Sequence, residues 1–124
     1  MTTLPIDVLE LAAELALDQR EVAKRTAVNR AYYAAAHRAC EIAIAAGLFD
    51  GPPNLHRTWG RLRALSNQPG WTSIGLEGLE LKAMRLAAEY DLRRPLEGDA
   101  ANAVDLAREL IARMDALPPP AGVR

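Results

Sequence analysis

The residues best suited to do chemistry lie in the stretch NRAYYAAAHRAC, residues 29–40. It places two adjacent tyrosines, two arginines and a histidine in a run that is otherwise rich in alanine. A solvated helix has no need of paired tyrosines, and a fully buried helix has little use for Arg30 or His37. The stretch therefore predicts either a polar site at the edge of a core or an unusual piece of core.

Helical spacing sorts this region into two neighbouring stripes. The core stripe recurs at three- and four-residue steps and consists of Val28, Tyr32, Ala35, Ala39, Ile42 and Ala46. A polar stripe about a third of a turn away consists of Thr26, Asn29, Arg30, Tyr33 and His37. Side by side, the stripes predict a half-buried groove. The alternative is an inert internal network in which Tyr33 and His37 satisfy one another.

A second polar group ends the segment KAMRLAAEYDLRRP, residues 82–95. Arg85 and Glu89 are four residues apart, and Tyr90 and Asp91 follow immediately. Taken alone, the pair is explained by an exposed salt bridge worth about 0.3–0.5 kcal/mol. We expect this helix end to face the polar stripe, so that both groups line one cleft.

The remaining histidine, His56, lies in the basic segment HRTWGRLR. We interpret it as a surface turn, in which Arg57 and Arg61 would contact phosphates if RNA approached. Trp59 is expected in the core, because a bundle with few aromatics buries its largest one. Two histidines without a metal-ligand spacing predict no metal site, and no cofactor motif is present.

Composition restricts the class of protein. The chain has 124 residues, half of them apolar, which suits a single domain with one core. Fifteen basic residues face sixteen acidic ones, so no overall basic field attracts nucleic acid. The single Cys40 excludes an internal disulfide. No leader and no apolar run of about 18 residues is visible, so no membrane partner and a cytoplasmic location are expected.

The composition is helical throughout, and Gly, Pro and Asn divide it. We predict an all-α, antiparallel bundle of four or five helices, forming one domain over residues 1–117 with a disordered tail over 118–124. The expected helices run over residues 5–17, 18–46 (ended by Gly47), 54–65 (capped by Asn54), 74–92 (weakened by Gly75 and Gly78) and 99–117 (capped by Asp99).

Three motifs in order give the chain a family likeness. RAYYAAAHRAC, NLHRTWGRL and RLAAEYDLRRP resemble the HEPN domain, above all its small stand-alone bacterial branch, over about residues 20–115. The resemblance implies a dimeric all-α bundle. It also implies a metal-independent endoribonuclease, often a toxin paired with a nucleotidyltransferase-type antitoxin.

Such an enzyme uses histidine to move protons at the ribose 2′-OH or the leaving 5′ oxygen, while arginine stabilises charge on the phosphate. Active members carry a histidine four to six residues after the arginine. Here none follows Arg85, and Tyr90 stands at that spacing. The expected catalytic pair is therefore Arg85 with His37 from the neighbouring helix.

Three readings stay open. The first is a non-catalytic or atypical HEPN-like module of a toxin–antitoxin or defence system that binds a nucleotide, RNA or a partner protein. The second is an active ribonuclease toxin, and the third a purely structural interaction bundle. A nucleotidyltransferase partner could also attach a nucleotide to Tyr90. The expected binding residues are Asn29, Arg30, Tyr33, His56, Arg57, Arg61, Glu89, Tyr90 and Asp91.

Overall fold

A computed structural model describes residues 2–96 and 98–121 of the chain. In this part the chain is helical, with no strand, which confirms the predicted all-α class. The elements are α1 (Pro5–Leu17), α2 (Glu21–Ala45), the short 3₁₀ helix η1 (Leu55–Arg57), α3 (Thr58–Arg63), α4 (Pro69–Tyr90) and α5 (Asp99–Ala116). None of the described helices is both long and apolar enough to cross a membrane.

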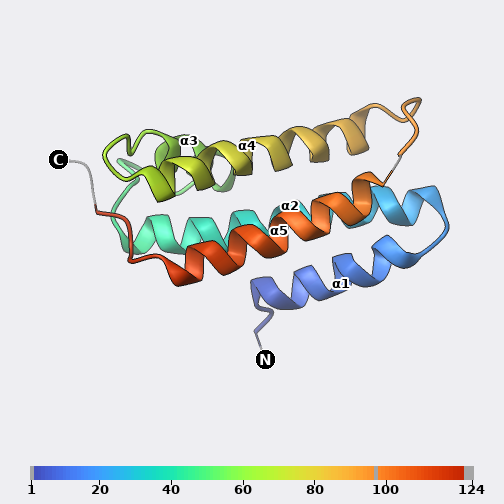
Figure 1. Ribbon diagram of the computed structural model, residues 1–124, viewed down its shortest axis with the longest axis horizontal. Coiled ribbons are helices and arrows are strands. Elements are labelled where there is room, and N and C mark those ends of the chain that lie inside the picture. Colours follow the sequence, from blue (N-terminus) through green and yellow to red (C-terminus); the bar gives the residue numbers. More distant parts are fainter. Residues whose placement is uncertain (1, 97, 122–124) are drawn as a thin grey trace.

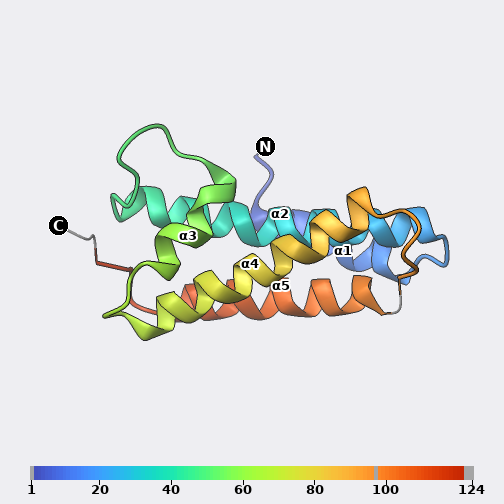
Figure 2. The same ribbon diagram turned by 90° about the horizontal axis from the view of Figure 1, so that it is seen from above.

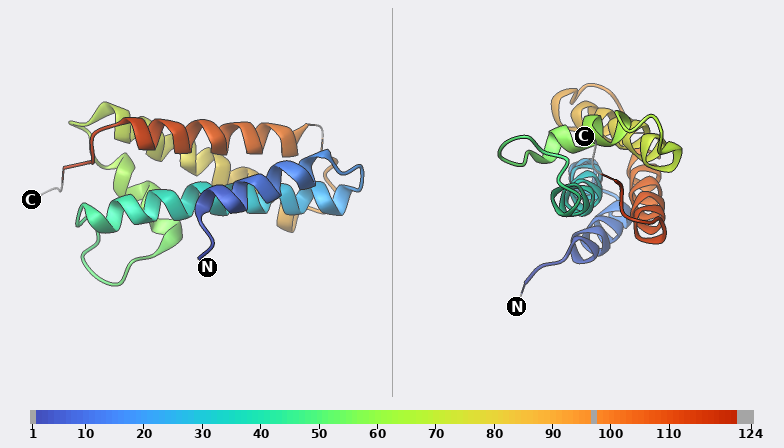
Figure 3. Two further views of the ribbon diagram at one scale, coloured as in Figure 1. Left: turned by 90° about the horizontal axis from the view of Figure 1, so that it is seen from below. Right: turned by 90° about the vertical axis from the view of Figure 1, so that its left-hand side faces the viewer.

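The four long helices form an antiparallel bundle (Figure 1). Helices α1 and α4 run in one direction and α2 and α5 in the other, and α1 lies diagonally opposite α4 (Figures 1 and 3). Helix α2 contacts every other helix, and α3 with η1 lies beside it at the end where α4 begins (Figure 2). The helical bundle was predicted from composition and punctuation, and α2 is its central member.

Alanine dominates the core where α2 meets its neighbours. The predicted core stripe is correct over its first four members, because Val28, Tyr32, Ala35 and Ala39 are fully buried. Its last two members, Ile42 and Ala46, are only half-buried. Helix α5 lies diagonally opposite α2. Ala103 and other small residues of α5 are buried in the same cluster, so α2 and α5 touch directly. Small side chains permit this close approach because the helix backbones themselves come near.

Several predicted helix ends are correct. Helix α1 spans the expected residues, with Pro5 in its first turn. Gly47 ends α2 with a φ of 69°, a left-handed conformation that glycine adopts without cost. The Asn54 side chain accepts a hydrogen bond from the His56 backbone N–H at 3.0 Å, as expected of a cap.

Other ends differ from the prediction. Helix α2 begins at Glu21 rather than at residue 18, because the Asp18 carboxylate accepts the Arg20 backbone N–H at 2.8 Å and holds a turn there. Helix α4 begins at Pro69 instead of residue 74, since proline suits a first helical turn. In α5, Gly98 is the cap, with a φ of 77°, and Asp99 is the first helical residue.

The tail also differs from the predicted disorder. The Trp71 indole N–H donates to the Pro118 carbonyl at 3.0 Å. Gln68 exchanges two hydrogen bonds with the Ala121 backbone, at 3.0 and 2.9 Å. Residues 118–121 are therefore held against the start of α4, whereas residues 122–124 lie outside the described part of the chain.

Helices α3 and α4 pack closely against each other at two glycines of α4. A Cβ added to Gly78 would lie 2.0 Å from the nearest atom of the Trp59 ring, and one added to Gly75 would lie 2.5 Å from the Arg63 backbone nitrogen. The two glycines were expected to weaken α4. They instead form a notch into which the fully buried Trp59 fits.

This notch generates a prediction. Gly78→Ala should destabilise the protein by about 3 kcal/mol or more, because the buried ring has no room to move aside. Gly60→Ala is the matched control, since that helical glycine has open space around it and alanine should be neutral or gain up to about 1 kcal/mol. Urea unfolding measures both, and equal stabilities would show that the notch is not needed.

Candidate functional site

Three distant segments meet on the outer side of the seam between α2 and α4 (Figure 2). Antiparallel packing brings Asn29 opposite Glu89 and the two tyrosines of α2 opposite Arg85. The 3₁₀ helix η1 adds His56 at the same place. The predicted convergence of the two helices is therefore confirmed. We call the set of Asn29, Tyr32, Tyr33, His56, Arg85 and Glu89 the seam cluster.

Arg85 is the centre of the seam cluster, and its side chain is only 9% exposed. Its Nη1 donates to Glu89 Oε2 at 2.8 Å. The guanidinium carbon lies 5.1 Å from the centre of the Tyr32 ring and 5.7 Å from that of Tyr33. Both are cation–π distances, and burial strengthens such contacts. The charge is thus held by one carboxylate and two rings.

One donor of Arg85 is left over. Its Nε is buried and has no hydrogen-bond partner among the described residues. Leaving a buried donor unpaired costs about 1–3 kcal/mol, so natural proteins seldom keep one without a reason. Glu89 already accepts one hydrogen bond on each oxygen, from the Asn29 amide at Oε1 and from Arg85 at Oε2. Because Arg85 Nε is itself buried, an acceptor from outside the chain would reach it only if a neighbouring side chain moved aside.

His56 is attached to the seam cluster through Tyr32. The imidazole Nδ1 lies 2.9 Å from the Tyr32 hydroxyl, and the Trp59 indole N–H donates to the same hydroxyl at 3.3 Å. Indole nitrogen only donates, so the hydroxyl oxygen accepts from Trp59 and its own hydrogen is free to donate to His56 Nδ1. Because the hydroxyl oxygen can also accept from an Nδ1–H, the contact is compatible with either neutral tautomer of His56.

The surroundings keep both groups uncharged. Burial lowers the pKa of His56, the positive charges of Arg85 and Lys82 lower it further, and the negative charge of Glu89 opposes them. Burial raises the pKa of Tyr32, although Trp59 and Arg85 act in the other direction. With His56 neutral, Lys82, Arg85 and Glu89 leave this region with one net positive charge.

His56 was interpreted as part of a surface turn, and that interpretation is wrong. It is half-buried, and its ring lies 5.7 Å from that of Tyr32 and 5.9 Å from that of Tyr33. His37, the histidine expected beside Arg85, is exposed and lies 6.2 Å from the Tyr33 ring, centre to centre. Both histidines thus lie near the Tyr33 ring, but His56 also contacts Tyr32, the other tyrosine that packs against Arg85.

The other predicted binding residues lie around the seam cluster or away from it. Arg30 and Arg57 are exposed, and Arg61 is paired with Asp50 at 3.5 Å. Tyr90 is 75% exposed, and Asp91 is exposed beyond the end of α4. Trp59 is in the core, as predicted.

A hollow of about 360 Å³ adjoins Asn29 and Glu89. It is lined on one side by apolar residues of the α2 start and the α4 end, and on the other by polar residues of α2. The lining residues are Val22, Arg25, Thr26, Asn29, Arg30, Ala88, Glu89 and Leu92.

Sequence reasoning missed Arg25. This buried arginine donates to the carbonyls of Ala88 at 2.9 Å, Asp91 at 3.2 Å and Arg94 at 2.6 Å, and so closes the end of α4. Its partner Glu21, one turn earlier at 3.3 Å, was the available signal. No cluster of metal-binding side chains occurs among the described residues.

Comparisons with known proteins add nothing to the geometry. No protein-family model, no curated protein and no solved structure matches this chain.

The lowered pKa of His56 generates a prediction. In the unfolded chain His56 titrates near the ordinary histidine pKa of 6.5, whereas in the folded chain its pKa is lower. As pH falls below 6.5, the unfolded chain is therefore protonated at His56 first, and the free energy of unfolding decreases until the pH passes the folded pKa. His56→Gln should lack this loss. The free energy of unfolding, followed from about pH 8 to about pH 5, should therefore fall more steeply for the wild type than for the variant. Parallel curves would contradict a neutral His56.

Proposed function

We propose that this chain is an HEPN-like helical module that binds a phosphate-bearing ligand, a nucleotide or single-stranded RNA, at the seam cluster. The observation that carries the proposal is the buried Arg85, which has an unpaired Nε and is flanked by His56 and two tyrosines. Structural networks normally end with every buried donor paired. The seam cluster ends with a buried donor that has no partner among the described residues, and the adjacent Lys82 gives the region one net positive charge.

The accessible parts of the site suit a nucleotide. Tyr33 is half-buried and offers a ring edge or face to a base, as single-stranded RNA sites do. Lys82 is also half-buried, and Arg30 is exposed, so both can reach phosphate oxygens. The adjoining hollow of about 360 Å³ falls within the range of ligand sites, with apolar Val22 and Leu92 on one side.

RNA binding is tested with a short labelled single strand in EDTA at low salt, followed by fluorescence anisotropy. Lys82→Ala should raise Kd by about 5-fold, the loss of roughly one phosphate contact. Arg108→Ala, which removes the same charge from an exposed site on α5, should leave Kd unchanged. Equal Kd values for the two variants, or no binding by the wild type, would overturn the proposal.

A second candidate is the metal-independent endoribonuclease, and one observation favours it: His56 accompanies Arg85. In that reaction the ribose 2′ oxygen attacks phosphorus, the bond to the 5′ oxygen breaks, and a 2′,3′-cyclic phosphate remains. Neutral His56, with its Nδ1–H donating to Tyr32, is placed to take the proton of the 2′-OH on Nε2, and the imidazolium so formed returns a proton to the leaving 5′ oxygen, while arginine balances the phosphate charge.

The same samples distinguish binding from cleavage. If the chain is a ribonuclease, strands ending in cyclic phosphate accumulate without metal. His56→Ala then abolishes the product, while His37→Ala, the matched change at the exposed histidine, retains it. If the RNA stays intact but binding is measurable, the ribonuclease is excluded and the binding module is supported.

Dimerisation is part of the proposal, and α4 offers a surface for it. Its outer face carries an apolar stripe at alternating three- and four-residue steps: Leu76, Leu79, Ala83, Leu86 and Tyr90. Leu76 is 46% exposed and Leu86 39%. The stripe extends seven residues to each side of Ala83, so a second copy related by a two-fold axis can place Leu76 opposite Tyr90 and Leu79 opposite Leu86, with the small Ala83 at the crossing.

The dimer prediction uses two exposed alanines on helices. Ala83→Glu would place like charges together at the two-fold axis and should give a monomer. Ala101→Glu on α5 should leave the dimer intact. Light scattering after size-exclusion chromatography measures the mass, and a monomeric wild type would exclude this surface.

The toxin–antitoxin setting and the nucleotidyltransferase-type partner rest on the HEPN resemblance. The 75% exposure of Tyr90 leaves its hydroxyl open to such an enzyme. Because Tyr90 ends the apolar stripe, attachment of a nucleotide there would oppose dimerisation.

A further inference from the structure

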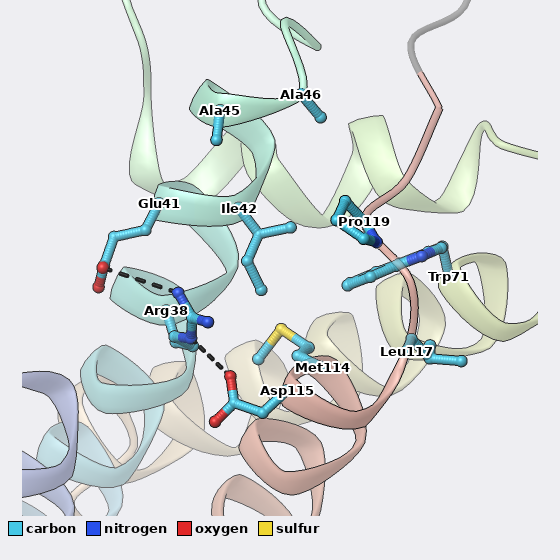
Figure 4. Close-up of a pocket in the computed structure, with 10 residues that line it drawn as sticks. All are labelled: Arg38, Glu41, Ile42, Ala45, Ala46, Trp71, Met114, Asp115, Leu117 and Pro119. Carbon is cyan, nitrogen blue, oxygen red and sulfur yellow. Dashed lines mark hydrogen bonds and ion pairs between the residues drawn. The ribbon is translucent and has the colours of Figure 1, made fainter.

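A second cavity lies at the far end of the bundle, where α1 stops covering α2. Helix α1 has 13 residues and α2 has 25, so at about 1.5 Å per residue α1 covers little more than half of α2. The uncovered part of α2 and the end of α5 enclose a cavity of about 510 Å³ (Figure 4).

Most of the cavity wall is apolar. Ile42, Ala45 and Ala46 of α2 line one side, and Met114 of α5 lies between them and Trp71 (Figure 4). Leu117 and Pro119 of the C-terminal segment complete the wall. Hydrogen bonds from Trp71 and Gln68 hold that segment in place. The cavity is thus built by ordered residues and has the volume of a small-molecule site.

The rim is acidic. Arg38 Nε donates to Asp115 at 2.7 Å, and Arg38 Nη1 lies 3.8 Å from Glu41, so one arginine faces two carboxylates. The dashed lines in Figure 4 mark both contacts. The rim therefore carries one net negative charge. About half of the Glu41 side chain and of the Asp115 side chain is exposed and can meet a ligand.

The end of α5 adds to the negative potential. The carbonyls of Met114, Asp115 and Ala116 would ordinarily accept from residues four positions later, but those are Pro118, Pro119 and Pro120, which have no N–H. No other donor to them is found in the described part of the chain. Helix α2 ends at the same side of the bundle, without a basic residue in its last turn. Such helix ends attract cations.

We propose that this cavity binds a small organic cation with an apolar body, such as an amine bearing an aromatic or aliphatic chain. The apolar body fills the space between Ile42, Met114 and Trp71. The ammonium group lies at the rim near Glu41 and Asp115. This site is independent of the seam cluster and of the proposed function.

The test uses three probes with the same body: phenylbutylamine, phenylbutanol and phenylbutyrate. Binding is followed by NMR, through the Trp71 indole N–H and the Ile42 amide. The amine should bind at least about 3-fold more tightly than the alcohol, and the acid should bind most weakly. An amine that binds no better than the alcohol, or none of the probes binding, would overturn the proposal.

Two pairs of variants locate the site. Ala45→Phe fills the cavity and should abolish the shifts, whereas Ala101→Phe, on the exposed side of α5, should not. Glu41→Gln neutralises the rim and should bring the amine to the affinity of the alcohol. Glu10→Gln, the same change at an exposed position of α1, should keep the preference. Binding that survives Ala45→Phe would place the amine elsewhere.

Discussion

The packing of Trp59 into the Gly75–Gly78 notch of α4 is the contact on which the rest of the structure depends. Helix α3 has only six residues, too few to be stable alone, so its position is set by this tertiary contact. The seated indole donates to the Tyr32 hydroxyl, which in turn holds His56. A shift of the indole would therefore pass through Tyr32 to the imidazole. Core packing and the geometry of the candidate site are in this way a single constraint.

Two buried arginines at the same seam differ in how fully their donors are satisfied. Arg25 donates to several main-chain carbonyls at the end of α4, where the helix dipole is negative. Arg85 packs against Tyr32, about two turns after Arg25 on α2. It has one carboxylate and two ring faces, and its buried Nε has no partner among the described residues. The two arginines have similarly polar surroundings, but Arg85 keeps a buried donor without a hydrogen-bond partner among the described residues. We place the site at Arg85 for that reason, and not because arginine is rare in cores.

The sequence predicted what depends on local pattern. The α1 bounds, the Gly47 and Asn54 ends and the core stripe of α2 follow from turn chemistry and periodicity, and the meeting of the two polar groups follows from antiparallel packing. What it missed depends on tertiary contacts. Gly75 and Gly78 look like helix breakers until the indole is seen against them. His56 looks like a surface residue because its partner Tyr32 is 24 positions away. Arg25 was missed because most of its acceptors are main-chain carbonyls, which leave no signature in the sequence, and Glu21 four residues earlier was the available signal.

The up-and-down order of the bundle separates the proposed anion site from the proposed cation site. Helices α1 and α4 end at one side of the molecule, and both ends receive a cation: Lys24 donates to the Ala16 carbonyl at 2.8 Å, and Arg25 closes α4. Helices α2 and α5 end at the other side. There α2 is closed by backbone donors from Gly47 and Leu48, which add no charge. The prolines after α5 supply no donor at all. Uncompensated negative potential therefore collects at one end only, beside the acidic rim, while the excess positive charge lies along the α2–α4 seam.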